Sequence, residues 1–460
     1  MKKNILFLYL FISSTLLFSQ ENHKKCNTNH LVNEEIKNNA DYYKARINET
    51  KPTNPNTEKT TITIPIVVHI IHRTSHANIG SGTNISDEQI EDQLRILNED
   101  YSKTNPEVAN PPRTIFSNYW GNPDLKFCLA TTDPNGNPTN GITRTPTTQV
   151  NWDADDDSSN PCHEANGMKK TACGGKDGWD PYKYLNIWVC DLTNSGSGLI
   201  MGYSYLPGLL QNPFNTSDDY KDGVVVDYRY FGTIDNAAPS SDGRTATHEI
   251  GHYLGLNHTF AEPNPPSYSC LDNNQNLICC DRDGGNVDDT PPTDGVYQSL
   301  PVNANTNNNT CNDLNYGFTT DLLDMDENFM SYASTTWMFS QGQVDAMRGT
   351  LNASEFNLGR VSLKNSDVST NCSGIISQTK NITSNIKLNI YPNPSKGNVL
   401  VNSSEKIISF SVVNILGEKV ISNNNINSNQ LDLNLLNDGV YFINVNTRKG
   451  VITQKIIIAK

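Results

Sequence analysis

Three histidines and a glutamate lie close together in the stretch HEIGHYLGLNH, residues 248–258. In a helix, His248 and His252 are one turn apart on the same face, so both imidazoles can reach one zinc ion. Glu249 points into the same cleft and is placed to act as a general base. With His258 as the third ligand, the fourth zinc position stays open for water, whose pKa the metal can lower to about 7. The pattern predicts a zinc site that hydrolyses peptide bonds.

The third histidine requires a change of chain direction after the helix. A continued helix would place residue 258 on another face, whereas a left-handed glycine at Gly255 ends the helix and returns His258 to the metal. The alternative is an amphipathic helix that carries histidines by chance. The fixed spacing, in a chain with nine histidines among 460 residues, argues against it.

The stretch resembles the HExxHxxGxxH signature of the metzincin zinc peptidases. About 70 residues downstream, NFMSY at residues 328–332 is similar to the methionine turn of that clan, and its wording is that of the pappalysin family. The resemblance implies that Met330 forms the apolar floor under the histidines. It also implies that Tyr332 stabilises the oxyanion of the tetrahedral intermediate. Ordinary core packing of Met330 and an ordinary half-buried Tyr332 are the alternatives.

The apolar patterns predict an α/β (α+β) catalytic domain, and the resemblance implies a mixed, twisted sheet above the zinc helix. Ser86 and Gln89 predict a capping box at the start of a helix. His69 and His72 belong to the first strand and are expected to be structural residues rather than ligands. Strands are predicted at residues 62–71, 125–130, 184–192 and 223–228, the zinc helix at 245–256, and a further helix at 340–351.

Residues 199–205 resemble the edge strand along which metzincins align an extended peptide, and a simple strand is the alternative.

The chain is organised as an exported, modular protein. The opening residues read as a signal peptide, and no other apolar run is long enough to span a membrane. A net charge of −14 argues against a nucleic-acid partner and suits solubility and calcium. The predicted order is a signal peptide at 1–20, a pro-segment at 21–56 with a helical stretch around 34–48, a zinc peptidase domain at 57–352, a linker at 353–385 and a C-terminal domain at 386–460.

Short alternating strands after residue 386 predict a small all-β sandwich. The motifs YPNPSKG at 391–397, NILGE at 414–418 and DGVY at 438–441, with a basic terminus at Lys460, resemble a type IX secretion sorting domain. The resemblance implies the type IX secretion machinery as a partner and a secreted or cell-surface location. A carbohydrate- or protein-binding β module is the alternative, although it would need an aromatic platform. We expect a monomer.

The ten cysteines have several roles open to them in an exported protein. Cys26 could ligate the zinc in place of water and keep a zymogen inactive, or it could be a spare thiol. Cys162 and Cys173 are a plausible local disulfide, and Cys128 and Cys190 could be buried thiols. The resemblance favours a disulfide between Cys270 and Cys311.

An aspartate-rich stretch precedes the methionine turn. Its carboxylates near a glycine turn are oxygen donors of the kind that calcium selects, and pappalysin relatives bind calcium in this loop. Asp288, Asp289 and Thr290 are the candidate ligands. A solvated acidic turn is the alternative, because the spacing does not match an EF-hand.

The predicted function is that of a secreted zinc endopeptidase acting on proteins or peptides. A non-catalytic binding or adhesion protein on the same fold is the alternative, and it would be expected to lose Glu249 or a histidine. Relatives that cut before Arg or Lys use a carboxylate just beyond the methionine-turn tyrosine, and residues 333–338 contain none. The sequence therefore argues against a basic preference. Trp337 in that stretch is expected to pack.

Overall fold

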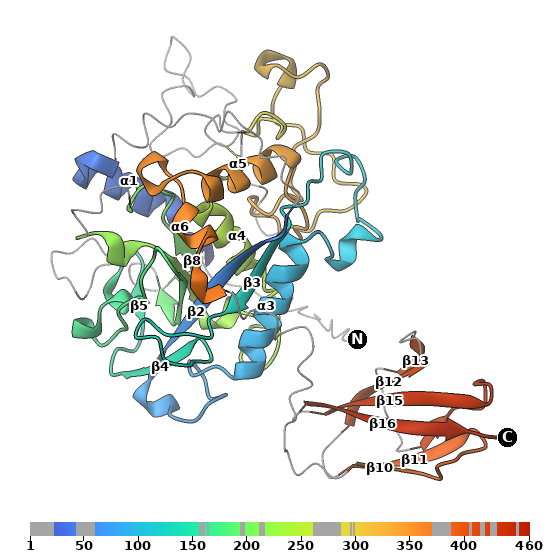
Figure 1. Ribbon diagram of the computed structural model, residues 1–460. Helices are drawn as coiled ribbons and strands as arrows, with labels where there is room; N and C mark the ends of the chain where they lie inside the picture. Colours follow the sequence, from blue (N-terminus) through green and yellow to red (C-terminus); the bar gives the residue numbers. More distant parts are fainter. Residues whose placement is uncertain are drawn as a thin grey trace, which may run out of the picture. The chain divides into compact units, whose positions relative to one another are not determined.

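The computed structural model separates into two units, one through residue 373 and one from residue 374 (Figure 1). Among the residues that it describes, no helix is long and apolar enough to cross a bilayer. The predicted signal peptide and Cys270 lie outside the described residues. The described residues are 23–42, 60–155, 162, 165–193, 198–210, 217–260, 287–294, 297, 300–369, 388–403, 407–414, 419–423, 430–447 and 450–460.

A seven-stranded sheet forms the centre of the catalytic unit, in the order β1-β8-β9-β6-β2-β3, with β4 also paired to β2. Every pair is parallel except β8 with β9, so the predicted mixed sheet is confirmed. The strands are β1 (His23–Cys26), β2 (Ile62–Arg73), β3 (Leu125–Leu129), β4 (Ile142–Thr147), β6 (Leu185–Cys190), β8 (Leu199–Ser204) and β9 (Val224–Asp227), and β5 (Trp152–Asp153) pairs separately with β7 (Leu192–Thr193).

The two faces of the sheet bury different cores. In β9, Val224 and Val226 join the core beneath the helices, whereas Val225 joins a second core on the opposite face. This follows from the alternation of side chains along a strand. The helices are α1 (Thr28–Asn38), α3 (Asp87–Tyr101), α4 (Arg244–Tyr253), α5 (Gln341–Asn352) and α6 (Val361–Lys364).

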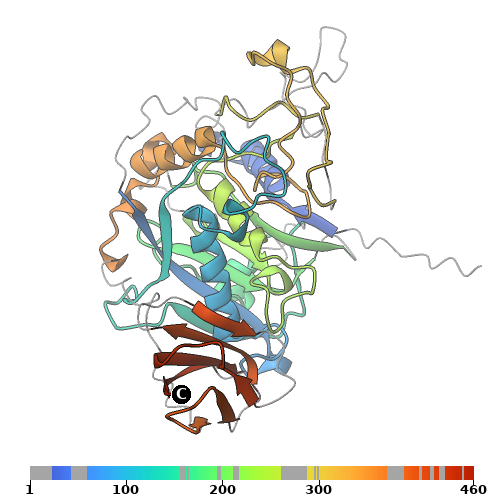
Figure 2. The same cartoon turned by 90° about the vertical axis from the view of Figure 1, so that its right-hand side faces the viewer.

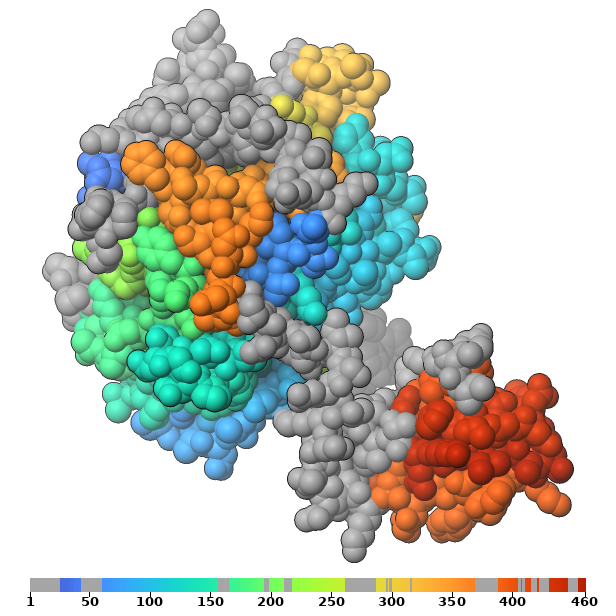
Figure 3. Space-filling model, viewed as in Figure 1, coloured from blue at the N-terminus to red at the C-terminus, as the bar shows by residue number. Residues whose placement is uncertain are grey.

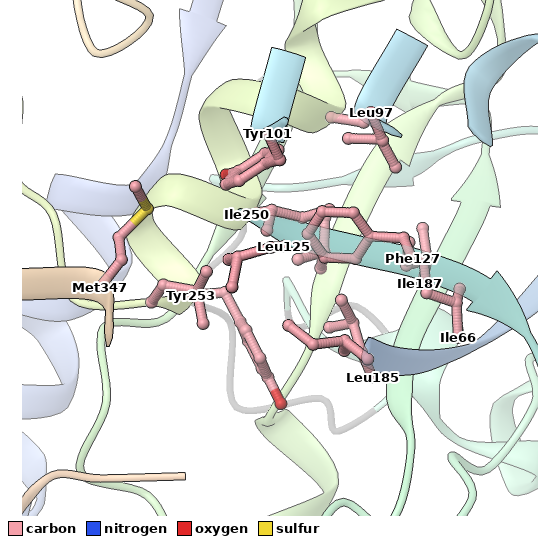
Figure 4. Close-up of a cluster of buried hydrophobic side chains, with 14 of the residues drawn as sticks. Ile66, Leu97, Tyr101, Leu125, Phe127, Leu185, Ile187, Ile250, Tyr253 and Met347 are labelled. Atoms are coloured by element: carbon pink, nitrogen blue, oxygen red, sulfur yellow. The ribbon is translucent and has the colours of Figure 1, made fainter. Parts of the chain in front are cut away.

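The predicted zinc helix is α4, and its apolar face lies against the sheet. Ile250 and Tyr253 lie close to Leu125 of β3 and Leu185 of β6, with Tyr101 of α3 nearby (Figure 4). Each such buried side chain contributes roughly 1.5–3 kcal/mol of apolar burial. This packing sets the depth of α4 relative to the sheet, and the view in Figure 2 shows α3 and α4 on the same side of it.

The helix starts differ in part from the predictions. Ser86 caps α3 by accepting from the Gln89 backbone N–H. The Gln89 side-chain oxygen accepts from the Asn236 N–H instead of the Ser86 N–H, and its nitrogen donates to the carbonyls of Tyr228 and Phe231. The capping box is therefore only half formed, because tertiary contacts use both ends of the side-chain amide. A complete box occurs at α5, between Ser340 and Gln343. The pro-segment helix begins at Thr28, earlier than the predicted stretch around residues 34–48.

Residues 353–369, predicted as the first part of a linker, fold onto the catalytic unit. Leu363 of α6 is buried in the main core. Arg360 forms a buried ion pair with Asp222 at 2.8 Å and donates from Nε to the Tyr253 carbonyl at 2.8 Å. In Figure 3 the orange surface of α5 and α6 is continuous on this face. The chain leaves the catalytic unit only after these contacts.

The C-terminal unit is the predicted all-β sandwich. One sheet has the order β10-β11-β14 and the other β13-β12-β15-β16, and both contribute to one apolar core. Strand β13 was not predicted. The strands are β10 (Leu388–Tyr391), β11 (Asn398–Ser403), β12 (Ile407–Asn414), β13 (Lys419–Asn423), β14 (Gln430–Asp432), β15 (Gly439–Thr447) and β16 (Gly450–Ile458).

Replacement of Arg360 should destabilise the catalytic unit. Arg360→Ala leaves Asp222 as an unpaired buried charge, and we expect a loss of about 3–5 kcal/mol in the free energy of unfolding, measured by urea denaturation. Lys183→Ala is the matched control, because Lys183 pairs with Asp367 at the surface at 4.0 Å and such pairs contribute about 0–1 kcal/mol. Equal midpoints for the two variants would contradict a structural role for residues 353–369.

Candidate metal centre and active site

The three predicted histidines converge on one point. The Nε2 atoms of His248, His252 and His258 lie 3.1–3.2 Å from one another, and all three side chains are buried. His248 and His252 come from α4, and His258 follows it. The predicted ligand set is thus brought together by the fold.

Hydrogen bonds on the far side of two rings determine which nitrogen faces the centre. Nδ1 of His248 lies 2.7 Å from the Phe329 carbonyl and Nδ1 of His252 lies 2.7 Å from the Leu256 carbonyl. A carbonyl only accepts, so Nδ1 carries the proton in each ring, and in a neutral ring Nε2 presents a lone pair. Burial lowers the pKa of both histidines, which favours the neutral form.

The donor set fits a zinc ion. Two buried imidazoles direct unprotonated nitrogens at each other and at His258, an arrangement that a cation stabilises and that is otherwise repulsive. Neutral imidazole nitrogens are common zinc ligands, and backbone carbonyls on their other nitrogens are the usual orienting groups. Cys26 and these three histidines could together hold a metal ion, because their ligand atoms all lie within 4.8 Å of one another. Among the described residues, this is the group of three or more His, Cys, Asp or Glu side chains that is close enough to do so.

Gly255 redirects the chain as the sequence predicted. Its φ of 98° lies in the left-handed region, and the Leu256 N–H returns to the Gly251 carbonyl at 3.0 Å. A side chain at 255 would be strained there. The turn accomplishes two things, because it brings His258 back to the centre and places the Leu256 carbonyl under His252.

Glu249 lies beside the metal centre and is fully buried. Its Oε2 accepts from Cys26 Sγ at 3.4 Å and from Thr28 Oγ1 at 3.2 Å. Its Oε1 has no hydrogen-bond partner among the described residues. Burial raises the pKa of Glu249 to about 8, opposed by the hydrogen bonds from Cys26 and Thr28. One carboxylate oxygen is therefore available to a reacting molecule.

Met330 lies directly below the zinc helix. It is fully buried, and a Cβ at Gly251 would overlap its sulfur. The glycine inside the HEIGH motif therefore permits the close approach of Met330. The Met330 carbonyl accepts from the Thr259 N–H at 3.4 Å, next to His258. This geometry agrees with the floor that the resemblance implies.

Tyr332 borders the centre on the side of His258. Its ring centroid lies 4.8 Å from that of His258 and 5.7 Å from that of His248. Its hydroxyl donates to the Cys26 carbonyl at 3.3 Å. The phenol is therefore close to the histidines while its oxygen contacts the pro-segment.

The pro-segment occupies the cleft as an added strand. Strand β1 pairs in parallel with β8, with Cys26 opposite Gly202. Cys26 is a free, buried cysteine among the histidines. Lys25, the residue before it, donates from Nζ to the carbonyls of Ser331 at 3.2 Å and Ala333 at 3.0 Å. The predicted edge strand thus exists, and β1 covers its free side.

The three candidate calcium residues differ in their surroundings, and Asp289 already has a structural role. Asp289 accepts from Ser340 Oγ and from the Gly342 N–H, each at 2.7 Å, and so caps α5. Thr290 is buried, and its Oγ1 has no hydrogen-bond partner among the described residues. Asp288 is exposed.

The remaining histidines and cysteines separate into structural roles. His69 forms hydrogen bonds with Thr143 and Asn186, and burial lowers its pKa to about 4. The other histidine of that strand, His72, faces the Arg73 carbonyl instead.

The Cys162–Cys173 disulfide is confirmed, and Cys190 is a free buried thiol as anticipated. Cys128 is disulfide-bonded, so the buried-thiol alternative was wrong for it, and Cys311 is also disulfide-bonded.

Two arginines that sequence reasoning missed, Arg113, which is buried, and Arg244, which is half-buried, contact the loop around the methionine turn. Arg113 forms an ion pair with Glu327, and its Nε lies 3.0 Å from Glu327 Oε1. Arg244, the first residue of α4, donates to the Thr336 carbonyl at 2.6 Å. Partners so far apart along the chain carry no local signal. Trp337 packs in the cluster beneath this loop, so the packing expectation is confirmed.

Known proteins resemble both units of this chain. The chain matches the model described as pregnancy-associated plasma protein-A over residues 171–352, and that of the secretion system C-terminal sorting domain over residues 389–459. An extracellular metalloprotease of Arthroderma gypseum is 26% identical over 291 residues, covering 62% of this chain and 71% of the relative. One from Pyricularia oryzae is 27% identical over 243 residues, covering 52% and 60%.

Solved structures extend this similarity. Tannerella forsythia mature mirolysin, in complex with a cleaved peptide, is 34% identical with a TM-score of 0.51, covering 66% of this chain and 96% of that one. A promirolysin mutant from the same organism is 29% identical with a TM-score of 0.56, covering 74% and 97%. The latter is a zymogen form.

Fold and site together define a secreted metalloendopeptidase with a metzincin-like catalytic unit and a type IX sorting tail. The chain belongs to the pappalysin family.

Metal binding should depend on the converging imidazoles. We expect zinc-loaded protein to hold one ion per catalytic unit, and His252→Ala to weaken zinc affinity by about 100-fold or more, since losing even an orienting partner costs 10–100-fold. Competition with a chromophoric chelator measures the affinity. His76→Ala is the control, because His76 bonds to Thr83 away from the site. Equal affinity in the two variants would show that the ion binds elsewhere.

Proposed function

We propose that this secreted metalloprotease hydrolyses peptide bonds with a water activated at the histidine centre and with Glu249 as general base. The observation that carries the proposal is the unpartnered Oε1 of Glu249 beside three converging imidazole nitrogens. A non-catalytic binding protein would not require this set, and every member of it is present.

The chain's own groups have distinct roles in the proposed reaction. When bound, a zinc ion held by His248, His252 and His258 acidifies water and polarises the scissile carbonyl. Glu249 takes the proton from the attacking water and passes it to the leaving amine. The Tyr332 hydroxyl, which donates to the Cys26 carbonyl of the pro-segment in this state, is placed to donate to the developing oxyanion once that segment leaves. Met330 supports the helix from below.

We infer that Cys26 and Thr28 keep the zymogen latent. The Cys26 thiol lies among the histidine nitrogens, where it would take the fourth position that water needs. Thr28 donates to Glu249 and accepts from the Ser204 N–H at 3.0 Å, so it bridges the base and strand β8. The metal position and the general base are then blocked by neighbouring residues of the same strand and helix start.

Lys25 supports a preference for basic side chains next to the scissile bond. It is half-buried beside Cys26, with two carbonyl acceptors and the Tyr332 ring 5.9 Å from its nitrogen. Burial lowers the pKa of Lys25, and the carboxylate of Asp242, just before α4, partly opposes this shift. The carbonyls of Ser331 and Ala333 and this carboxylate supply the negative potential that the side chains of residues 333–338 lack.

We also propose that Asp288, Asp289 and Thr290 bind a calcium ion. The buried, unpartnered Oγ1 of Thr290 supports it, while the capping contacts of Asp289 supply a purely structural role. Calcium analysis of dialysed wild-type and Asp289→Asn protein distinguishes the two, because only a ligand role makes the calcium content fall.

Loss of Glu249 should abolish cleavage and leave the metal bound. We expect Glu249→Gln, in protein freed of its pro-segment, to reduce kcat by about 10²- to 10⁴-fold or more on a mixed peptide library, with unchanged zinc content. Glu88→Gln is the control, because Glu88 is exposed on α3. Retained activity would exclude the proposed base.

The cut sites in the wild-type digest test the basic preference. The proposal fails if Lys and Arg are not enriched next to the scissile bond.

Loss of Cys26 should release activity without any chain cleavage. We expect full-length Cys26→Ala to cleave the library in a chelator-sensitive manner, and Cys26→Ala with Thr28→Val to be more active still, because the base is then also unblocked. Cys190→Ala removes the other described free thiol and should stay latent. Latency of the double variant, with zinc bound, would contradict this account.

A further inference from the structure

Beyond the end of strand β8, the pro-segment covers a surface of mixed chemistry, here called the α1 surface. It comprises Leu206, Gly208, Leu209, Asp218 and Lys221. Leu31 and Val32 of α1 share an apolar core with Leu206 and Leu209, and all four are buried. The α1 surface therefore has an apolar part that the pro-segment shields from water.

An aromatic ring occupies a second part of this surface. Tyr42 is fully buried, and its hydroxyl donates to the Leu206 carbonyl at 3.1 Å. A Cβ at Gly208, where φ is 138°, would lie 3.0 Å from the Tyr42 ring. Gly208 thus makes room for the Tyr42 ring, and the Leu206 carbonyl accepts a hydrogen bond from its hydroxyl.

A charged pair forms the third part. Glu35 of α1 pairs with Lys221 at 2.7 Å, and their side chains are 6% and 17% exposed. Lys221 also pairs with Asp218 at 3.0 Å, and Asn39 of the pro-segment donates to Asp218 at 3.2 Å. The Lys221 carbonyl accepts from the buried Lys169 Nζ at 2.5 Å, which fixes the backbone beneath the pair. The position of the cation is therefore set by the catalytic unit.

Activation would uncover these parts together. The pro-segment runs along β8 to Cys26 at the histidine centre and enters α1 at Thr28, so the α1 surface continues the line on which an extended chain binds. Without α1, apolar side chains and a partly satisfied cation would face solvent next to the cleft. Contiguous apolar surface of this kind marks binding sites in soluble proteins.

We propose that the α1 surface of the activated enzyme binds a segment of the protein substrate remote from the scissile bond. The expected segment is amphipathic, with neighbouring apolar residues and a carboxylate about one helical turn away. Leu31, Val32 and Glu35 of α1 contact the α1 surface in this pattern in the zymogen. The proposal rests on the proposed function, because it requires removal of the pro-segment. It assigns to the enzyme a preference for long acidic, apolar substrates that a short peptide cannot show.

The test uses the peptide of residues 29–42, which lacks both Cys26 and Thr28 and so leaves the metal and Glu249 free. Its binding to activated enzyme is measured by fluorescence anisotropy. Its effect is then measured on cleavage of casein, a long unfolded substrate, and of a short quenched-fluorescent peptide. Lys221→Glu is the enzyme variant, and Lys126→Glu, on β3 at the other edge of the sheet, is its matched control.

We expect the bound peptide to lower kcat/KM for casein about fivefold or more while leaving the short peptide unaffected. A peptide with Glu35→Lys should bind about tenfold more weakly to the wild type and recover against Lys221→Glu, since a charge swap restores the pair. Unchanged casein cleavage, equal slowing of both substrates, or absence of binding would overturn the proposal. Failure of the short peptide to be cleaved would instead contradict the proposed function itself.

Discussion

The catalytic unit depends on one constraint, the convergence of three imidazole nitrogens inside a buried pocket. Two of these nitrogens face inward because the backbone carbonyls of Phe329 and Leu256 accept hydrogen bonds from the Nδ1–H groups on the other side of the rings. Those carbonyls belong to the methionine turn and to the turn after Gly255. The metal centre is therefore oriented by loops, and the loops in turn need α4 held at a fixed depth against the sheet.

Several buried contacts maintain that depth. Tyr253 and Ile250 pack α4 against the sheet and α3, and Gly251 lets Met330 approach from below. Arg244 ties the start of the helix to the loop beyond the methionine turn, while Arg360 ties its end to residues that follow α5. Both arginines are paired with carboxylates, so their charges are balanced within the protein. None of these contacts involves the pro-segment.

The edge of strand β8 connects latency with substrate binding. The same strand that would align a substrate pairs with β1, and the residues of β1 and α1 reach the metal position, the base and the surface beyond in one continuous run. The pro-segment places a thiol among the histidines, a lysine against backbone carbonyls, and an apolar, acidic helix beyond. The proposals on substrate preference rest on these contacts.

The sequence alone determined the parts of this protein that depend on local spacing. The histidine motif, the left-handed Gly255, most strands of both units and the short disulfide between Cys162 and Cys173 could be predicted, because periodicity, turn chemistry and one-turn spacing are local properties. The tertiary structure decided the rest. The pairing of Arg113 with Glu327, the amide contacts of Gln89, the packing of Arg360 on the zinc helix and the capping role of Asp289 all join residues that are distant along the chain, and their energies depend on burial that exists only after folding.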